Sequence, residues 1–385
     1  MRGYHRPVTV SPDPVTAASS VPVLPVRPEL AGEAPYGAPQ LDVPVLLNVN
    51  ENPYPPSAAV VREIAESVAT AAHGLNRYPD REFLDLRADL AEYLAVESGV
   101  RLPAEQIWAA NGSNEVMLHL LQGFGGPGRT AVSFAPTYSM YPEYARDTHT
   151  RWVAGRRTED FDVDPAEARA LLARENPSVV LLTSPNNPTG TALSLDTVRA
   201  VLDEAAAVPG GCVVVVDEAY GEFRRDGVPS ALTLLAEYPH LAVSRTMSKA
   251  FGLAGARIGY LAASRELVDV LRIVRLPYHL SAVTQATARA ALRHSAALMA
   301  QVGSLRAERD ALVAWLRAQG HRVADSDANF VLFGTFPDRH AIWQGLLDRG
   351  VLIREVGPDG WLRVSVGTPE ETAAFKAALT EVVGQ

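Results

Sequence analysis

One of the two lysines in this arginine-rich chain lies where its amine could do chemistry. Lysine and arginine together number 35, and the lysines are Lys249 and Lys376. Lys249 follows Ser248 in the sequence Ser-Lys-Ala-Phe-Gly-Leu-Ala-Gly-Ala-Arg, which ends at Arg257. A lysine amine can lose its proton and attack a carbonyl to form a Schiff base, whereas a guanidinium stays protonated. We therefore interpret Lys249 as a candidate catalytic residue.

A carboxylate and two hydrogen-bonding side chains are candidate partners for a cofactor ring. Asp217 ends a run of valines, and a carboxylate at the end of a buried strand is costly unless it has a cationic or hydrogen-bonding partner. Asp217 could cap a helix, or it could pair with the protonated ring nitrogen of pyridoxal phosphate. Asn187, in a turn flanked by prolines, is either an ordinary turn residue or, together with Tyr220, a ligand of the phenolic oxygen of that cofactor.

A third group of residues could hold a phosphate. Ser113 and Asn114 follow a predicted strand and open a helical apolar pattern. Ser113 could act there simply as the N-cap, but the same geometry exposes N–H groups at a positive helix end. Arg257 and Ser248 could add a guanidinium and a hydroxyl to this phosphate site, although each could equally make a surface ion pair or a turn.

Short apolar runs that alternate with helical patterns position these residues. The runs read as buried strands, with a helix at 198–207 between two of them; they cover residues 130–134, 179–183, 212–216 and 241–244. This alternation predicts an α/β fold with a mostly parallel sheet wrapped by helices. The candidate residues follow the strands, and ligands of such sheets gather at the carboxyl ends of the strands.

The chain divides into three predicted parts. Residues 1–47 are rich in proline and predict a disordered start that runs into an extended arm. Residues 48–283 form the larger domain, with helical spacing from about residue 57 and again from Phe83. Residues 284–385 form a smaller α+β domain that begins with one long helix as far as Leu316 and ends with a helix from Pro369.

Composition excludes several classes of function. The net charge of −9 argues against a nucleic-acid partner. No apolar stretch is long enough to span a membrane, and no secretory signal is recognisable. The single cysteine, Cys212, cannot form an internal disulfide, and no cluster has the spacing of metal ligands. We expect a cytoplasmic protein without a metal.

Several motifs together resemble the fold-type I, pyridoxal-phosphate-dependent aminotransferases, and among them the histidinol-phosphate aminotransferase family. The motifs are residues 35–40, 48–56, 76–80, 136–141, 184–190, 217–220, 248–257, 351–354 and 362–363. The resemblance covers roughly residue 28 to the end of the chain. It implies pyridoxal 5'-phosphate as cofactor and a homodimer.

The resemblance also implies a role for each candidate residue. Lys249 would form the Schiff base with the cofactor, and Asp217 would pair with the pyridine nitrogen. The other cofactor ligands would be Ser113, Asn114, Tyr138, Asn187, Tyr220, Ser248 and Arg257, together with Tyr78 of the neighbouring subunit. The substrate would be bound by Tyr36, Asn52, Arg354 and Arg363.

The activity implied is transamination of histidinol phosphate with 2-oxoglutarate in histidine biosynthesis, with Lys249 moving the proton. An aromatic amino-acid aminotransferase on the same scaffold is the nearest alternative. A decarboxylase of a phosphorylated amino acid is more distant. A regulatory domain joined to a DNA-binding module is disfavoured, because the proline-rich residues before the core are too few for a helix-turn-helix domain.

Overall fold

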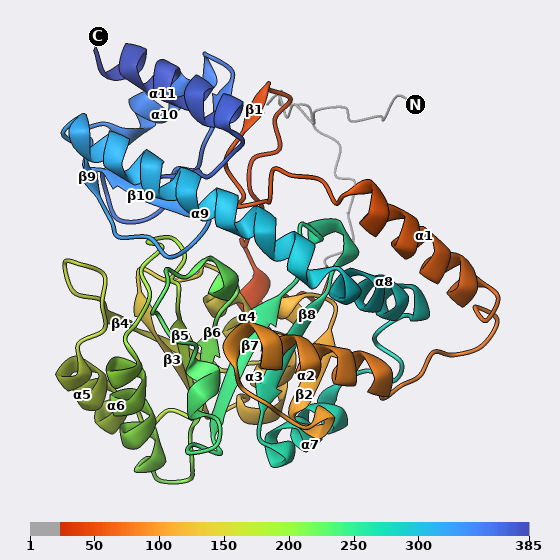
Figure 1. The fold of residues 1–385 in the computed structure, drawn as a ribbon. Coiled ribbons are helices and arrows are strands. Elements are labelled where there is room, and N and C mark those ends of the chain that lie inside the picture. The colour runs from red at the N-terminus through yellow and green to blue at the C-terminus, as the bar shows by residue number, and fades with distance from the viewer. Residues whose placement is uncertain (1–23, 385) are drawn as a thin grey trace, which may run out of the picture. The chain divides into compact units, whose positions relative to one another are not determined.

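The computed structural model of the protein describes residues 24–384, and Figure 1 shows how the elements follow one another. Residues 24–37 belong to a separate unit that contains a short 3-10 helix, Pro28–Leu30 (η1). The predicted disordered start lies largely outside the described residues. Near the end of the predicted arm, Val45–Leu46 (β1) is a strand.

A sheet that has seven strands in the described residues supports the candidate site. The strands are Ile107–Ala110 (β2), Thr130–Ala135 (β3), Arg151–Arg156 (β4), Val179–Thr183 (β5), Val213–Asp217 (β6), Leu241–Thr246 (β7) and Gly259–Ala263 (β8). Their spatial order is β2-β8-β7-β6-β5-β3-β4. Among these strands, β8 runs antiparallel to both of its neighbours, β2 and β7, and all other adjacent pairs are parallel. The predicted mostly parallel sheet is therefore confirmed.

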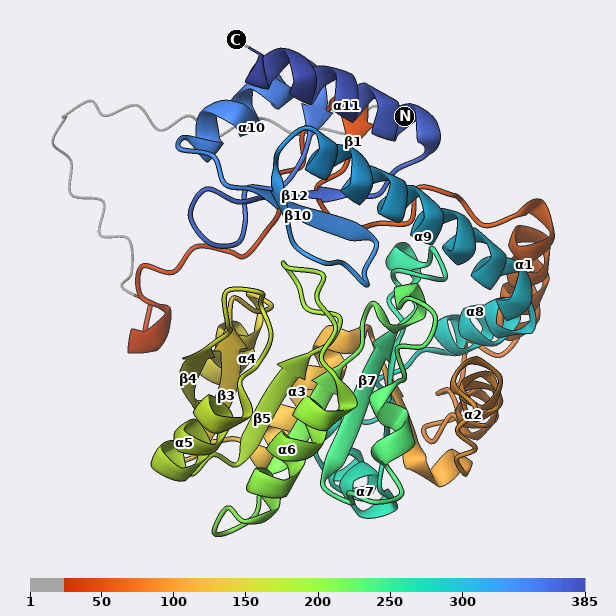
Figure 2. The same ribbon diagram turned by 60° about the vertical axis from the view of Figure 1, so that its left-hand side comes forward.

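Helices cover both faces of this sheet, which is why its central strands are apolar on both sides. Every residue of β5 and β6 is buried. In Figure 2, α6 lies in front of the sheet and α3 behind it. The helices around the sheet are Ser113–Phe124 (α3), Tyr141–Asp147 (α4), Pro165–Glu175 (α5), Leu195–Ala206 (α6) and Arg265–Val274 (α7).

Three further helices are Ala58–Ala72 (α1), Leu84–Ser98 (α2) and Ala282–Arg293 (α8); α8 packs against both α1 and α2, and α2 packs against β2. Leu86, Leu90 and Leu94 of α2 are fully buried, so the helical spacing predicted after Phe83 is confirmed. Short 3-10 helices complete the connections: Ala104–Gln106 (η2), Gly221–Phe223 (η3), Ala231–Leu234 (η4) and Ala254–Ala256 (η5). Among the helices of residues 24–384, none is long and apolar enough to cross a bilayer.

The C-terminal part is built on a second, smaller sheet. Phe330–Gly334 (β10) pairs antiparallel with Arg322–Val323 (β9) and with Leu362–Ser365 (β12). Val351–Leu352 (β11) pairs parallel with β1. The helices here are Ser295–Ala318 (α9), Arg339–Leu347 (α10) and Pro369–Val383 (α11). A hydrophobic core around this sheet is separate from that of the seven-stranded sheet. The domain limits at 47/48 and 283/284 stay a prediction, because the larger core also includes residues beyond 284, among them Leu298, Leu305 and Phe330.

One predicted element is wrong. The single helix expected from about residue 284 to Leu316 is two helices, α8 and α9, which are interrupted at His294. The backbone of His294 leaves helical geometry (φ −106°, ψ 14°), and its side chain contacts Glu63 of α1. The apolar spacing continues through both helices, so it does not reveal an interruption of one residue. That interruption coincides with the contact between His294 and Glu63, which are far apart in the sequence.

Candidate active site

Asp217 lies at the carboxyl end of β6, and its carboxylate is buried. The Tyr141 hydroxyl donates to Asp217 Oδ2 (2.9 Å), and the Ala219 N–H donates to Oδ1 (3.2 Å). Burial raises the pKa of the Asp217 carboxyl to about 6. No arginine, lysine or histidine within residues 24–384 forms an ion pair with it. No helix begins directly after Asp217, so the helix-cap alternative does not apply.

The next residue shows how a carboxylate is treated when it does have cations. Glu218 is also buried, but it contacts Arg245 (2.7 Å) and Arg224 (3.0 Å). Burial acts to raise the pKa of Glu218, and the two arginines overcome this effect, so the pKa is lowered. Glu218 is therefore neutralised by arginines of this chain, whereas Asp217 is available to pair with a cation from a bound ligand.

Lys249 lies beyond the end of β7, the strand that pairs with β6. The register places Asp217 opposite Ser244, five residues before Lys249. Lys249 Nζ donates to the Val49 carbonyl (3.0 Å) and lies 6.0 Å from the centre of the Tyr220 ring. Burial, with a smaller contribution from the charge of Arg363, lowers the pKa of the Lys249 amine to about 8. This amine loses its proton far more easily than an exposed lysine.

Tyr220 and Asn187 bond to different partners near the Phe330 ring. Asn50 Nδ2 donates to the Tyr220 hydroxyl (3.0 Å), and Arg363 donates to Asn187 Oδ1. The Phe330 ring lies 5.0 Å from the Tyr220 ring and 5.1 Å from the Arg363 guanidinium. A cofactor residue and a substrate residue from the prediction, Asn187 and Arg363, are therefore in direct contact.

The residues predicted to hold a phosphate surround the first turn of α3. A Cβ on Gly112, whose φ is +83°, would lie 2.4 Å from an Arg257 guanidinium nitrogen, so a larger residue here would displace the guanidinium. Arg257 also donates to Ser248 Oγ (3.3 Å). The expectation that Ser113 caps α3 is wrong, because Gly112 holds the cap position and Ser113 is the first helical residue. A cap without a side-chain acceptor leaves the first N–H groups of the helix for another ligand.

The aromatic residue predicted to stack on the cofactor lies close to this helix end. The Tyr138 hydroxyl donates to Asn114 Oδ1 at 3.5 Å, and the Tyr138 ring meets the Tyr141 ring edge to face. Tyr138 therefore contacts both Asn114 and Tyr141, the residue that donates to Asp217.

Two of the four predicted substrate residues form a backbone pair. Arg354 and Arg363 exchange both backbone hydrogen bonds in an antiparallel bridge (2.9 Å each). Arg354 Nη1 is buried and has no hydrogen-bond partner in the described residues. Asn52 Nδ2 donates to the Ala250 carbonyl (3.2 Å), next to Lys249. An unpaired guanidinium nitrogen fits an anionic substrate.

The roles predicted for Tyr36 and Tyr78 are not tested by these contacts. Tyr36 belongs to the separate N-terminal unit and stays a prediction. Tyr78 is 79% exposed, and its ring stacks on Tyr278 at 4.4 Å. Its predicted contact is with a second subunit, so it stays a prediction as well.

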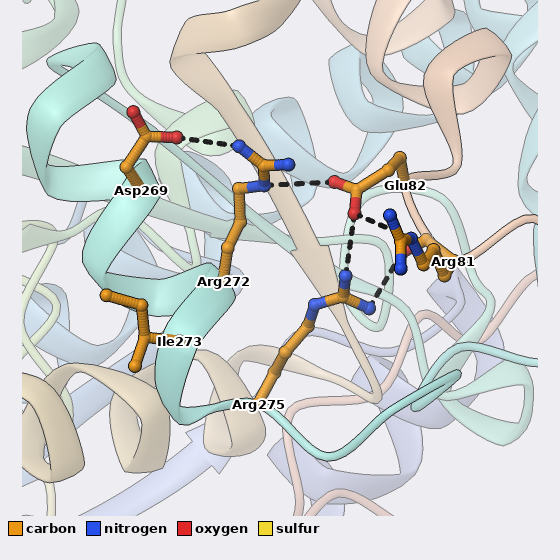
Figure 3. Close-up of a pocket in the computed structure, with 6 residues that line it drawn as sticks. All are labelled: Arg81, Glu82, Asp269, Arg272, Ile273 and Arg275. Atoms are coloured by element: carbon orange, nitrogen blue, oxygen red, sulfur yellow. Dashed lines mark hydrogen bonds and ion pairs between the residues drawn. The ribbon is translucent and has the colours of Figure 1, made fainter.

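The sequence reasoning missed two side chains that hold the predicted residues. Tyr141 holds Asp217, and Asn50 holds Tyr220. Both lie inside motifs that carried the resemblance, so their position in those motifs was the available signal. A separate hollow near α7 contains none of the predicted residues (Figure 3). Its arginines are paired with acids, for example Arg272 and Arg275 with Glu82 (3.0 and 2.8 Å).

Comparison with known proteins gives a consistent result. Residues 43–379 match the family model of aminotransferase class I and II. The chain is 62% identical to histidinol-phosphate aminotransferase of Thermobifida fusca, over 95% of this chain and 97% of that protein. It is 54% identical to the enzyme of the same name from Mycolicibacterium smegmatis, over 97% of each. Among solved structures, histidinol-phosphate aminotransferase from Sinorhizobium meliloti in complex with pyridoxal-5'-phosphate superimposes with a TM-score of 0.80 (24% identity, 96% of this chain and 99% of that one).

Proposed function

This chain belongs to the class I and II aminotransferase family, and on that premise we propose that it transfers the amino group of histidinol phosphate to 2-oxoglutarate, with pyridoxal 5'-phosphate as cofactor. The reaction is a step of histidine biosynthesis. The observation that carries the chemistry is that Asp217 and Lys249 come from the carboxyl ends of two adjacent strands: a buried carboxylate with no cationic partner among the described residues, and an amine whose pKa is about 8.

The residues of this chain fit the cofactor. Asp217 offers the negative charge that a protonated pyridine nitrogen requires. The approach of Gly112 to Arg257, with Ser248 beside it, leaves a positive cradle at the start of α3 for a phosphate. We assign Ser113, Asn114, Ser248 and Arg257 to this phosphate, Tyr138 to stacking on the ring, and Asn187 and Tyr220 to the phenolic oxygen.

When it is bound, pyridoxal phosphate supplies an electron sink that stabilises negative charge at the substrate α-carbon. Lys249 would take the proton from the substrate α-carbon and deliver it to the cofactor carbon C4′, and an amine whose pKa is about 8 is suited to act as base and then as acid near neutral pH. Asp217 keeps its charge because a facing cation lowers the pKa that burial has raised.

The substrate preference follows from the two arginines. Histidinol phosphate has no carboxylate, and its anionic end is a phosphate ester that carries nearly two charges. Arg363 is already held by Asn187 and the Asn48 carbonyl, whereas Arg354 Nη1 has no partner in the described residues. Two guanidinium groups on neighbouring strands can each offer a fork of donors to phosphate oxygens.

The test of the substrate is a direct competition. Purified enzyme loaded with pyridoxal phosphate receives histidinol phosphate or phenylalanine, with 2-oxoglutarate as acceptor, and glutamate formation is measured. We expect a higher kcat/KM for histidinol phosphate. A preference for phenylalanine would overturn the substrate assignment and would leave the aminotransferase chemistry intact.

The proposal includes a cytoplasmic homodimer in which Tyr78 completes the partner's site. The exposure of Tyr78, with its ring ordered against Tyr278, supports this assignment. Co-expression of Tyr78→Ala and Lys249→Ala chains tests it, because a mixed dimer keeps one site with both residues intact. We expect activity from the mixture although each variant alone is inactive. If the mixture stays inactive although mixed dimers form, Tyr78 does not act across an interface.

A further inference from the structure

Three successive residues after β1 hold three of the site residues. The Asn48 carbonyl accepts from Arg363 Nη2 (2.9 Å), and the Val49 carbonyl accepts from Lys249 Nζ (3.0 Å). Asn50 Nδ2 then donates to the Tyr220 hydroxyl (3.0 Å). The first two contacts use backbone carbonyls, which any residue could supply. The contact of Asn50 with Tyr220 uses a side chain, and it therefore depends on the identity of the residue.

The direction of the Asn50 amide is set by Ser365 of β12. The Asn50 N–H donates to Ser365 Oγ (2.9 Å), and the Ser365 hydroxyl donates to Asn50 Oδ1 (3.0 Å). Because the amide oxygen is used by Ser365, the amide NH2 is turned towards Tyr220. The backbone of Asn50 is left-handed (φ 56°), a conformation that asparagine adopts more readily than most residues. Asn50 is buried, with 2% of its surface exposed.

A hydroxyl that accepts a hydrogen bond points its own proton away from the donor and becomes a stronger donor itself. We propose that Asn50, held by Ser365, is a positioning residue that makes the Tyr220 hydroxyl a donor towards the phenolic oxygen of the cofactor. This inference rests on the proposed function, in which Tyr220 contacts that oxygen. It also means that β12 of the smaller sheet acts on the cofactor through Asn50.

A double-mutant cycle tests whether Asn50 acts through Tyr220. The variants are Asn50→Gly, Tyr220→Phe and the two combined, and glycine preserves the left-handed backbone. The measurement is the pH midpoint of the visible absorbance change of the enzyme loaded with pyridoxal phosphate. A weaker donor leaves more negative charge on the phenolic oxygen, which holds the neighbouring proton to higher pH. We expect Asn50→Gly to raise the midpoint by about 0.5 pH unit, a factor of about three in the equilibrium, and Tyr220→Phe to raise it more.

In the Tyr220→Phe background, Asn50→Gly should add no further shift. Ser365→Ala should shift the midpoint in the same direction, and it serves as the second variant if Asn50→Gly fails to fold. Ser178→Ala is the control, because it also removes a serine hydrogen bond (Ser178 Oγ to Thr130 O, 3.4 Å). Ser178 precedes the amino end of β5, whereas the candidate site lies at the carboxyl ends of the strands, so this variant should cause no shift.

Two results would overturn the inference: an equal shift from Asn50→Gly in both backgrounds, or unshifted midpoints in both Asn50→Gly and Ser365→Ala. The wild-type enzyme separates this failure from that of the proposed function. If wild-type protein acquires no pH-dependent visible band with pyridoxal phosphate, the proposed function itself fails. If it does and the variants titrate as wild type, only the role of Asn50 is wrong.

Discussion

Replacing Asp217 by asparagine should stabilise the cofactor-free protein and at the same time disable the enzyme. Burial raises the pKa of the Asp217 carboxyl to about 6, about two units above its value of roughly 3.9 in an unfolded chain. At 1.36 kcal/mol per unit, the ionised carboxylate costs about 3 kcal/mol of folding free energy at neutral pH. Asparagine has the same shape and no charge, so it avoids this cost.

The sign of the pH dependence follows from proton binding. Between pH about 4 and about 6 the folded protein holds this proton and the unfolded chain does not, so Asp217 makes stability fall as pH rises through that window. We therefore expect cofactor-free Asp217→Asn to be more stable than wild type by up to about 3 kcal/mol above pH about 7, and to differ little near pH about 4. Urea denaturation at the two pH values measures this difference.

Activity should move in the opposite direction. The variant removes the counter-charge of the ring nitrogen, and loss of a preorganised electrostatic group costs about 3–4 kcal/mol, or roughly 10²–10³-fold in turnover. Glu218→Gln is the matched control: this neighbouring carboxylate is paired with Arg245, so its loss should destabilise the protein. Our reasoning is refuted if cofactor-free Asp217→Asn is less stable than wild type at neutral pH, or if its turnover falls by less than about tenfold.

Three further predictions concern the proposed site. Lys249→Ala should abolish turnover and the yellow colour of the cofactor-loaded enzyme. Lys249→Arg should be inactive as well, because arginine does not deprotonate. Transamination at a near wild-type rate by either variant would show that Lys249 is not catalytic. The pKa of Lys249 is about 8, below its unfolded value of roughly 10.4, so the stability of the cofactor-free protein should rise with pH between these values. Lys249→Met should flatten this slope in melting curves, and an unchanged slope would assign it to other groups. Arg354→Ala should lower kcat/KM for histidinol phosphate much more than for any amino acid accepted, whose carboxylate Arg363 alone can bind; equal losses on both would contradict the substrate assignment.

The sequence by itself determined the fold class and the chemical types present in the site. The apolar runs before Asp217 and near Lys249 predicted buried strands, and the structure has strands there at Val213–Asp217 and Leu241–Thr246. These signals are local, because a strand buried on both faces must be apolar along its whole length. The strand ends then indicated which side chains to examine.

Only the tertiary structure decided how those side chains pair. Asn187 meets Arg363, Tyr220 meets Asn50, and Asp217 meets Tyr141, across separations of 176, 170 and 76 residues. Ser113 proved to be the first residue of its helix, with the cap at Gly112 lying against Arg257. Such contacts depend on the order of the strands and on where the smaller sheet lies against the larger one. A local pattern carries no record of either, because the free energy that selects these contacts arises only when distant segments are buried together.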